Sequence, residues 1–345
     1  MNQASKAPAV PLPPWPKGDE RGMANTLGPG TWWRCAPYLM APGAKCYELS
    51  HEISNAMPSS PFSNPLKLQP RPTRGMRNAV HASNMETLTG DQGAQGTHVD
   101  ALGHFGAVAE AWDGSGEFPV DQAFYYGGFR QKEVKPEPSS MLMKLGIHNV
   151  PPIITTAVLL DAKAHVGGGR TLAPGTTITA DHIEAMLEAQ GLERRGILPG
   201  DVLYIHTGWG ENWGDPEPEK RYYTEGPGLG YDAARYLGEK AVVLVALDNP
   251  FTDAVNHGQL KGEAPPADGY PKGLPFAIHH HCLVEAGIHQ IQNAKLDELA
   301  RDRVWISCTI ILPLRVRGGC GSLVRPVAIG TPGSQVQRNE ASMSL

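Results

Sequence analysis

Short apolar runs of strand length recur along the chain with helix-like segments between them, and this alternation restricts the fold more than any other feature. Strands are expected at 157–160, 202–205, 241–247, 305–314 and 323–329. Helices are expected from a cap at Thr179 to about Gly191, at 232–237, and at 282–286 with Gly287 as the stop. Interleaved helices and strands argue for an α/β or α+β protein built around a mixed sheet, and we expect the α/β class, with a central mixed β-sheet or barrel-like core flanked by helices.

The organisation of the chain predicts one catalytic domain. Gly (40 residues) and Pro (31 residues) make up about a fifth of the 345 residues, which favours a loop-rich enzyme over a helical bundle. No linker and no repeat of fixed period interrupts residues 22–330. We therefore expect a single domain at 22–330, preceded by an irregular N-terminal arm (1–21) and followed by a flexible C-terminal tail (331–345).

Charge and composition argue against several classes of partner. The net charge of -5 and the absence of basic runs disfavour nucleic acid and anionic membrane surfaces. Glycine-rich phosphate-binding motifs are missing, and no apolar run approaches the roughly 20 residues of a membrane span. Five scattered cysteines without a CxxC pair, and no signal-like apolar segment, indicate a cytoplasmic protein with reduced thiols.

The segment 93–105 has the outline of a metal site. His98 and Asp100 are two residues apart, so in an extended segment their side chains point to the same side. His104 lies four residues beyond Asp100 and would return to the same pocket if a helical turn begins there. Zinc and manganese accept such nitrogen and oxygen ligands. A single histidine is more often a surface or core residue, but three potential ligand residues within seven positions favour a metal site.

Further candidates lie downstream, each with a purely structural alternative. Consecutive side chains diverge, so at most one or two of the three histidines at 279–281 can enter one pocket. His280 and Gln292, twelve residues apart, could face one site from the two ends of a helix-loop element. Four residues are candidates for substrate binding or else for turn capping and core packing: His206, Asp248, Trp112 and Trp209.

These two groups of residues resemble the metal-dependent hydrolases of the Putative cyclase family, which includes kynurenine formamidase and isatin hydrolase. The family motif His-x-Gly-Thr-His-x-Asp-x-Pro-x-His-Phe is similar to residues 94–105, and its downstream His, Gly-Ile and Glu are similar to His280, Gly287-Ile288 and Gln292. Weaker similarities extend to 48–51 and 321–325. The resemblance implies a fold of the swivelling β/β/α type and assembly as a homodimer or homotetramer.

Two departures from the family pattern bear on the metal. Ala94 stands at the first family histidine, a metal ligand, so that Gln95, Gln92, His51 or water would have to take its place. Gln292 replaces a glutamate that helps to hold two cations in dinuclear members, which implies one metal ion, as in the isatin hydrolase-like branch. We expect Mn²⁺ or Zn²⁺ on His98, Asp100 and Gln95.

The resemblance implies hydrolysis of an amide, lactam or lactone bond in a small cyclic or aromatic molecule by a metal-activated water. His104 would move the proton, and His280 and Gln292 would orient the water or donate to the oxyanion. Two alternatives remain open. His98, Asp100 and His280 also match the two-histidine, one-carboxylate set of non-haem iron oxygenases, and Ala94 is compatible with a small-molecule-binding relative that has lost catalysis.

Overall fold

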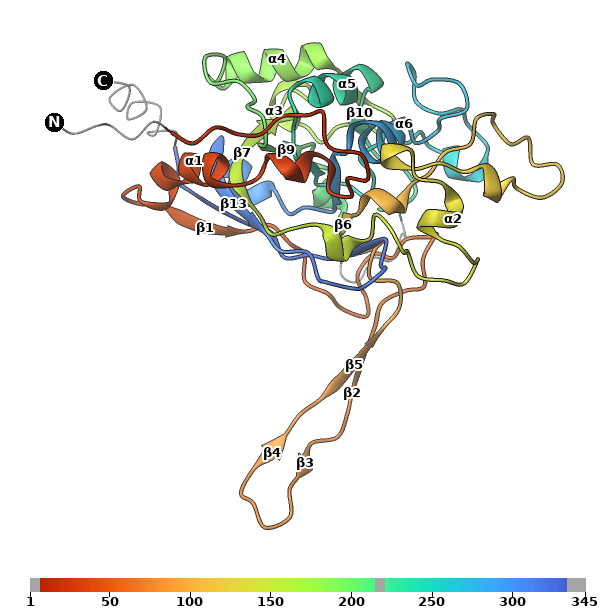
Figure 1. The fold of residues 1–345 in the computed structure, drawn as a ribbon. Helices are drawn as coiled ribbons and strands as arrows, with labels where there is room; N and C mark the ends of the chain where they lie inside the picture. Colours follow the sequence, from red (N-terminus) through yellow and green to blue (C-terminus); the bar gives the residue numbers. More distant parts are fainter. Residues whose placement is uncertain (1–6, 215–220, 334–345) are drawn as a thin grey trace.

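A nine-stranded mixed sheet forms the centre of the protein in the computed structural model, which describes residues 7–214 and 221–333. In spatial order its strands are β1 (Lys45–Glu48), β15 (Val327–Gly330), β13 (Ile306–Ile311), β7 (Ile153–Asp161), β9 (Val202–His206), β11 (Leu244–Leu247), β12 (His289–Gln292), β6 (His98–Asp100) and β14 (Gly321–Leu323). The four strands from β7 to β12 are parallel, and the remaining neighbours pair antiparallel. The sheet is curled and flanked by helices, which confirms the predicted fold class (Figure 1).

Helices cover this sheet. The α-helices are α1 (Pro29–Leu39), α2 (Gln131–Val134), α3 (Ala162–His165), α4 (Ala180–Ala189), α5 (Tyr231–Glu239), α6 (Ala277–His279) and α7 (Asp297–Arg301), and α6 continues into the π-helix η8 (His280–Ala286). Short 3-10 turns lie at Gly22–Thr26, Leu102–His104, Val120–Gln122, Tyr126–Gly128, Ile147–Asn149, Trp209–Asn212 and Gln259–Lys261. None of the helices in the described ranges has both the length and the apolar composition needed to cross a membrane.

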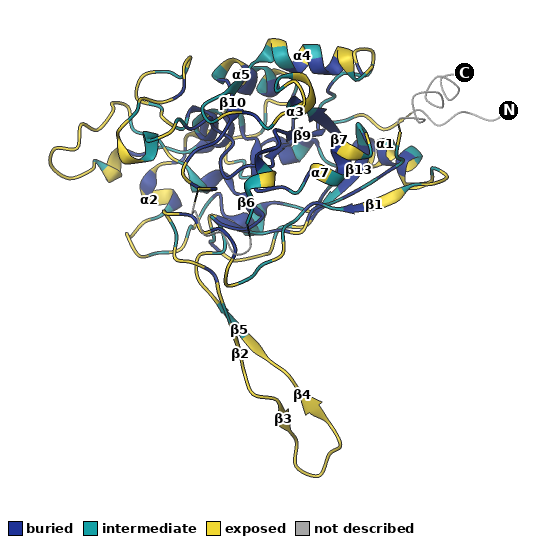
Figure 2. Ribbon diagram, turned by 180° about the vertical axis from the view of Figure 1, so that it is seen from behind, coloured by how far each residue is buried: buried dark blue, intermediate teal, exposed yellow. Residues whose placement is uncertain are grey.

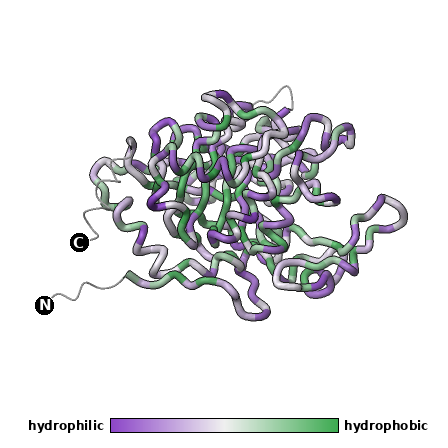
Figure 3. The backbone as a smooth tube through the Cα atoms, turned by 90° about the horizontal axis from the view of Figure 1, so that it is seen from above, coloured by the Kyte–Doolittle hydropathy of each residue, from purple (hydrophilic) through white to green (hydrophobic). Residues whose placement is uncertain are grey.

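The core lies along the parallel strands. Val202–Ile205 in β9 and Leu244–Leu247 in β11 are fully buried, because helices and neighbouring chain cover both faces of the sheet there (Figure 2). Parallel strands buried on both faces are nearly continuous apolar runs, which is why these two could be read from the sequence. The most hydrophobic part of the backbone accordingly lies at the middle of the molecule (Figure 3).

The predicted helix after Thr179 is present as α4. The Thr179 hydroxyl accepts the backbone N–H of His182 at 3.2 Å, and Ile183, Met186 and Leu187 are buried. The segment predicted as helical at 282–286 belongs instead to the π-helix, which ends at Gly287 in the left-handed conformation (φ 71°). That glycine is required, since an added Cβ would lie 2.7 Å from the Tyr126 ring.

The N-terminal segment 7–21 contains no helix or strand and is nevertheless tied to the body. The carboxylate of Glu20 accepts the N–H of Leu145 at 2.8 Å and the amide of Asn149 at 2.7 Å, and it pairs with Lys144. The rest of the expected N-terminal arm (1–6) and most of the expected tail (334–345) lie outside the described residues.

Residues 65–90, here called the projecting hairpin, extend away from the body as a narrow ribbon (Figure 1). β2 (Lys67–Pro70) pairs with β5 (Glu86–Thr89), and further out β3 (Arg74–Gly75) pairs with β4 (Ala82–Ser83). Every residue from 69 to 86 is exposed (Figure 2). The remaining small sheet joins β8 (Thr177–Ile178) to β10 (Gly228–Leu229).

Candidate metal centre

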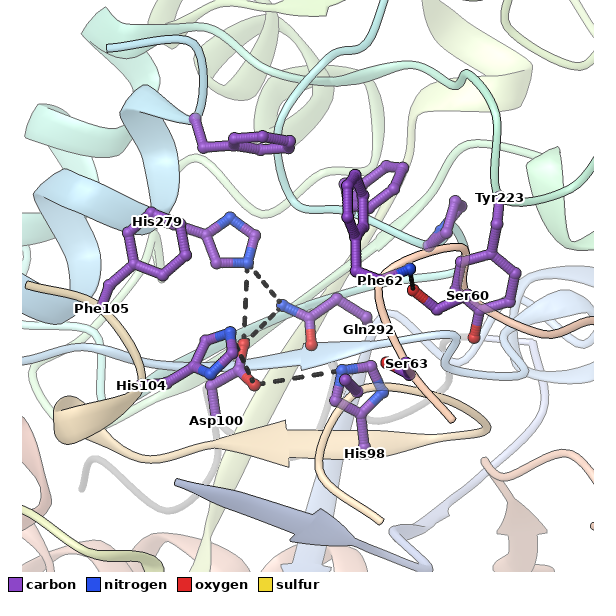
Figure 4. A pocket seen from close by; sticks show the side chains of 14 residues that line it. Ser60, Phe62, Ser63, His98, Asp100, His104, Phe105, Tyr223, His279 and Gln292 are labelled. Atoms are coloured by element: carbon purple, nitrogen blue, oxygen red, sulfur yellow. Dashed lines mark hydrogen bonds and ion pairs between the residues drawn. The ribbon is translucent and has the colours of Figure 1, made fainter. Parts of the chain in front are cut away.

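A cavity of about 320 Å³ lies where β6 and β12 meet the chain around α6 (Figure 4). It is lined by Ser60, Phe62, Ser63, Ala94, His98, Asp100, His104, Phe105, Tyr223, Pro250, Phe251, Phe276, His279 and Gln292. These residues come from distant parts of the sequence. The cavity therefore depends on the tertiary fold as a whole.

Strand register places the polar groups of this cavity. His98 and Asp100 alternate with Val99 along β6, so both point to the cavity while Val99 points to the core. In the antiparallel pairing with β12, Gln292 lies opposite His98 and Gln290 lies opposite Asp100. The side chains of His98, Asp100 and Gln292 are consequently buried together on one face of the sheet.

The Asp100 carboxylate is the centre of the group (Figure 4). Its Oδ1 lies 4.0 Å from Nε2 of both His98 and His104, and its Oδ2 lies 3.7 Å from Nε2 of His279. Oδ2 accepts the Gln292 amide at 2.8 Å, but the buried Oδ1 accepts no hydrogen bond from any described residue. A buried carboxylate oxygen among three imidazoles is costly unless a cation or a proton compensates it.

Hydrogen bonds at Nδ1 orient the imidazoles of His98 and His279, so that Nε2 of each ring faces Asp100. Nδ1 of His98 lies 2.9 Å from the Gly96 carbonyl oxygen, which can only accept, so Nδ1 carries the proton and Nε2 keeps a free lone pair. Burial lowers the pKa of His98, which keeps the ring neutral as a metal ligand requires. Nδ1 of His279 contacts the Asp253 carboxylate, which also accepts the backbone N–H of Ile278 at 2.7 Å.

The electrostatics of the other two imidazoles are dominated by carboxylates. Burial lowers the pKa of His279, but Asp253 and Asp100 outweigh it and the net shift is upward. Burial also lowers the pKa of His104, but Asp100 and the nearby Cys320 thiol outweigh it and the net shift is upward. One ligand atom from each of Asp100, His104 and His279 lies within 4.8 Å of the others, so this donor set fits a divalent cation.

The structure places His279, and not His280, in the cavity. His280 points away, with Nε2 3.3 Å from Glu285, and lines a second cavity of about 820 Å³ that also contains Trp112. His279 is the last residue of α6, and His280 begins the π-helix, whose wider turn holds one more residue than an α-helical turn. The histidine that reaches Asp100 is His279, which lies thirteen residues before Gln292. The family spacing of twelve residues therefore selects His280, the adjacent histidine.

Gln95 lies beside the cavity without lining it. Its amide donates to the carbonyl oxygens of Asp91, at 3.0 Å, and Asn64, and so fixes the base of the projecting hairpin. His51, another possible replacement for the family histidine, stacks on Trp213 with ring centroids 4.2 Å apart. Ala94 itself lines the cavity.

Three lining residues that sequence reasoning missed come from the loop before the hairpin: Ser60, Phe62 and Ser63. Tyr223, Phe251 and Phe276 were missed as well, because no pattern distinguishes them from other aromatic residues. The only available signal was the high content of Ser, Pro and Asn at 58–65, which marks a loop but does not place it.

The remaining predicted substrate-binding residues support the loops behind the cavity. Asp248 accepts the Thr207 N–H at 2.7 Å and the Gly208 N–H at 2.9 Å, and so acts as a turn cap. His206 bonds to Asp161 through Nδ1 at 2.9 Å. Trp209 is buried in a cluster with Tyr223 and Phe251, which do line the cavity.

Comparisons with known proteins agree with this architecture. Residues 47–254 match the family model described as Putative cyclase, a match that includes His98, Asp100 and His104 and ends before His279. A crystal structure described as a novel cyclase superposes with a TM-score of 0.72 at 24% identity, covering 91% of this chain and 95% of that one.

Two isatin hydrolases share the fold at lower similarity. One, bound to the product analogue thioisatinate, has a TM-score of 0.56 at 18% identity and covers 86% of this chain and 96% of its own. Isatin hydrolase A from Ralstonia solanacearum has a TM-score of 0.54 at 20% identity and covers 86% of this chain and 95% of its own. No curated protein sequence matches.

Proposed function

The chain belongs to the Putative cyclase family, and from this premise we propose that it is a metal-dependent hydrolase of a small cyclic or aromatic amide or lactam. One observation carries the proposal. Oδ1 of Asp100 is buried, accepts no hydrogen bond from the described residues, and lies 4.0 Å from two imidazole nitrogens. The isatin hydrolases that share the fold support a hydrolase, and the donor set supports a metal ion.

Two imidazoles, those of His98 and His104, lie equally close to Asp100, each with Nε2 4.0 Å from its Oδ1. We assign the more buried one, His98, to hold one divalent ion, Mn²⁺ or Zn²⁺, together with Asp100 and His279, and this leaves His104 for proton transfer. When bound, such an ion lowers the pKa of a coordinated water from about 15.7 toward about 7 and polarises a carbonyl group. Gln292 is neutral and donates to Asp100, so it adds no negative charge that could hold a second cation. The carboxylate of Asp253 fixes the ring of His279, and the Gly96 carbonyl fixes that of His98.

His104 is the residue best placed to move protons. Its side chain is 26% exposed, against 6% for His98 and 8% for His279, so it can exchange protons with the open side of the cavity. An imidazole at this position can take a proton from water and return it to the leaving nitrogen.

The wall of the cavity indicates the substrate class. Phe62, Phe105, Phe251, Phe276 and Tyr223 present aromatic surface to a volume of about 320 Å³, which suits a small planar molecule. The buried Oε1 of Gln292 has no hydrogen-bond partner among the described residues. It can accept an N–H from a lactam or amide, whereas a lactone or ester offers none, and a site built around such a bond discriminates strongly.

The test is metal analysis of the purified protein together with hydrolysis of matched lactams and lactones. We expect about one divalent ion per chain and faster turnover of each lactam than of its lactone analogue. His98→Ala and Asp100→Asn should lose both metal and turnover, whereas His165→Ala, which changes an exposed histidine in α3, should lose neither. Oxygen consumption by the iron-loaded protein, or stoichiometric metal with no hydrolysis of any amide, lactam or lactone, would contradict the proposal.

A further inference from the structure

The second cavity, of about 820 Å³, lies beside the metal cavity and shares part of its wall. Phe105 and Phe276 line both cavities, and their ring centroids lie 6.4 Å apart in an edge-to-face contact. The Phe105 ring also lies 5.0 Å from the ring of His279 (Figure 4). The volume falls within the roughly 300–1,000 Å³ of small-molecule sites, and no step of the proposed hydrolysis uses this space.

Exposed apolar side chains of one loop gather at the second cavity. Trp112 is 47% exposed, Phe118 46% and Val120 46%, and all three line it. The Trp112 ring packs edge-to-face on Phe118 with 5.8 Å between centroids, and its indole N–H donates to the Ser115 carbonyl oxygen at 2.9 Å. Apolar surface gathered on a cavity wall marks a binding site, and these rings favour an aromatic ligand.

Hydrogen bonds hold another part of the wall in place. The buried Gln131 accepts the Tyr125 hydroxyl at 2.7 Å and donates its amide to the Lys135 carbonyl oxygen at 3.1 Å, and all three residues line the cavity. At Gly273 the chain lies so close to the loop that an added Cβ would be 3.3 Å from Ala111. The cavity is therefore preformed, which lowers the entropy cost of binding a ligand.

The charges around the second cavity favour an anion. Lys135 and Lys272 line it, and neither forms an ion pair with a carboxylate in the part of the chain that the structure describes. No Asp or Glu is among the described residues that line it, although the whole chain carries -5. The acidic residues of the neighbouring loop are exposed and lie outside the lining: Glu110, Asp113, Glu117 and Asp121. A carboxylate can accept hydrogen bonds from two ammonium groups at once.

We propose that the second cavity binds a small aromatic carboxylate. Its ring packs against Trp112 and Phe118. Its carboxylate accepts from the ammonium groups of Lys135 and Lys272. Opening a neutral lactam breaks the C–N bond and joins the oxygen of water to the carbonyl carbon, so the product of the proposed hydrolysis belongs to this class of ligand. That link to the product rests on the proposed function, whereas the binding site does not.

Calorimetric titration with naphthoate tests the site, with the uncharged naphthamide and the non-aromatic cyclohexanecarboxylate as matched probes. We expect one naphthoate per chain, bound at least about tenfold more tightly than either of the other two. The titration is repeated after chelation, because without a metal ion the Asp100 carboxylate repels an anion from the metal cavity. Naphthoate binding should survive chelation, and it should do so whether or not the protein is a hydrolase.

Trp112→Ala tests the aromatic wall. It should weaken naphthoate binding at least about tenfold, because the bound ring loses a large apolar partner. Trp32→Ala is the matched control, since it removes a tryptophan of similar exposure (52%) from α1, and it should leave the affinity within about twofold. Equal affinities of the two variants for naphthoate would place the probe elsewhere and overturn the proposal.

Lys135→Gln combined with Lys272→Gln tests the charge. This double variant should weaken naphthoate binding at least about tenfold and leave the affinity for naphthamide unchanged. Lys132→Gln with Lys261→Gln removes the same charge from exposed lysines outside the cavity and should have much less effect. Equal effects of the two double variants, equal binding of naphthoate and naphthamide, or loss of naphthoate binding on chelation would overturn the proposal. So would the absence of naphthoate binding at millimolar concentration.

Discussion

His279 and His280 are adjacent in sequence but face different cavities, and this difference gives a prediction for which each residue is the control for the other. His279→Ala removes an imidazole 3.7 Å from Asp100 and should lower metal affinity by 10-fold or more, together with turnover. His280→Ala should leave both within about twofold. Metal titration and initial rates would decide it, and the reverse order of effects would contradict the assignment.

Ala94 gives a second prediction at the scale of one residue. It lines the cavity near the proposed ion, so Ala94→His should add an imidazole ligand and slow the loss of metal to a chelator. Ala94→Leu adds a side chain of similar bulk with no ligand atom and should not. Equal rates of metal loss in the wild type and the histidine variant would show that the added ring does not reach the ion.

His51 predicts part of the acid sensitivity of the fold. Burial lowers its pKa to about 4 from an ordinary 6.5, and its Nε2 has no hydrogen-bond partner in the described residues. Below pH 6.5 the unfolded chain binds a proton that the folded chain refuses, so the free energy of unfolding falls as the pH drops from 6.5 toward 4.

His51→Phe keeps an aromatic ring for the stack on Trp213 and removes the imidazole that binds the proton in the unfolded chain. The variant should lose less stability than the wild type between pH 7 and pH 4.5, by roughly 2 kcal/mol. Urea unfolding at the two pH values measures this difference. Parallel losses in the two proteins would mean that His51 is not buried as a neutral ring.

At the scale of elements, the cap of α4 can be tested directly. Thr179→Ala removes the acceptor of the His182 N–H and should cost about 1 kcal/mol of stability, while Thr179→Ser keeps the hydroxyl and should cost less. Thermal unfolding of the three proteins gives the comparison. Equal losses for Ala and Ser would assign the effect to the methyl group of threonine.

The elements that sequence reasoning found are those whose pattern is set by burial. β9 and β11 are continuous apolar runs, and α4 has an apolar face and a cap. β6 and β12 were not found as strands because their alternate residues are the polar groups of the cavity. The projecting hairpin was not found either, since no core imposes an apolar alternation on it.

For the candidate metal site, the sequence could place together only those residues whose proximity follows from local spacing. The proximity of His98, Asp100 and His104 could be predicted from local spacing, because two of them share a three-residue strand and the third ends the 3-10 turn that follows it. His279 could not be identified, because its orientation depends on a π-helix that local spacing does not reveal. Gln95 was selected for its ligand atom, but its amide is occupied by the base of the hairpin.

For the whole molecule, the proposed ion should act as a cross-link between distant segments. β6 and α6 are separated by almost 180 residues, and binding to the folded state alone stabilises it by about 2.7 kcal/mol when free metal is a hundred times the dissociation constant. Chelation should therefore lower the melting temperature by a few degrees and readdition should restore it. In Asp100→Asn the melting temperature should not respond to chelator.

The position of β6 in the sheet has a consequence for how the protein is made. Its neighbours are β12 on one side and β14 on the other, both close to the end of the chain. While the ribosome is still adding residues 101–288, His98 and Asp100 have been synthesised, but the strands that hold them in register have not. We therefore expect metal loading to follow the synthesis of β12, and the nascent chain carries two of the proposed metal ligands without their neighbouring strands for more than half of translation.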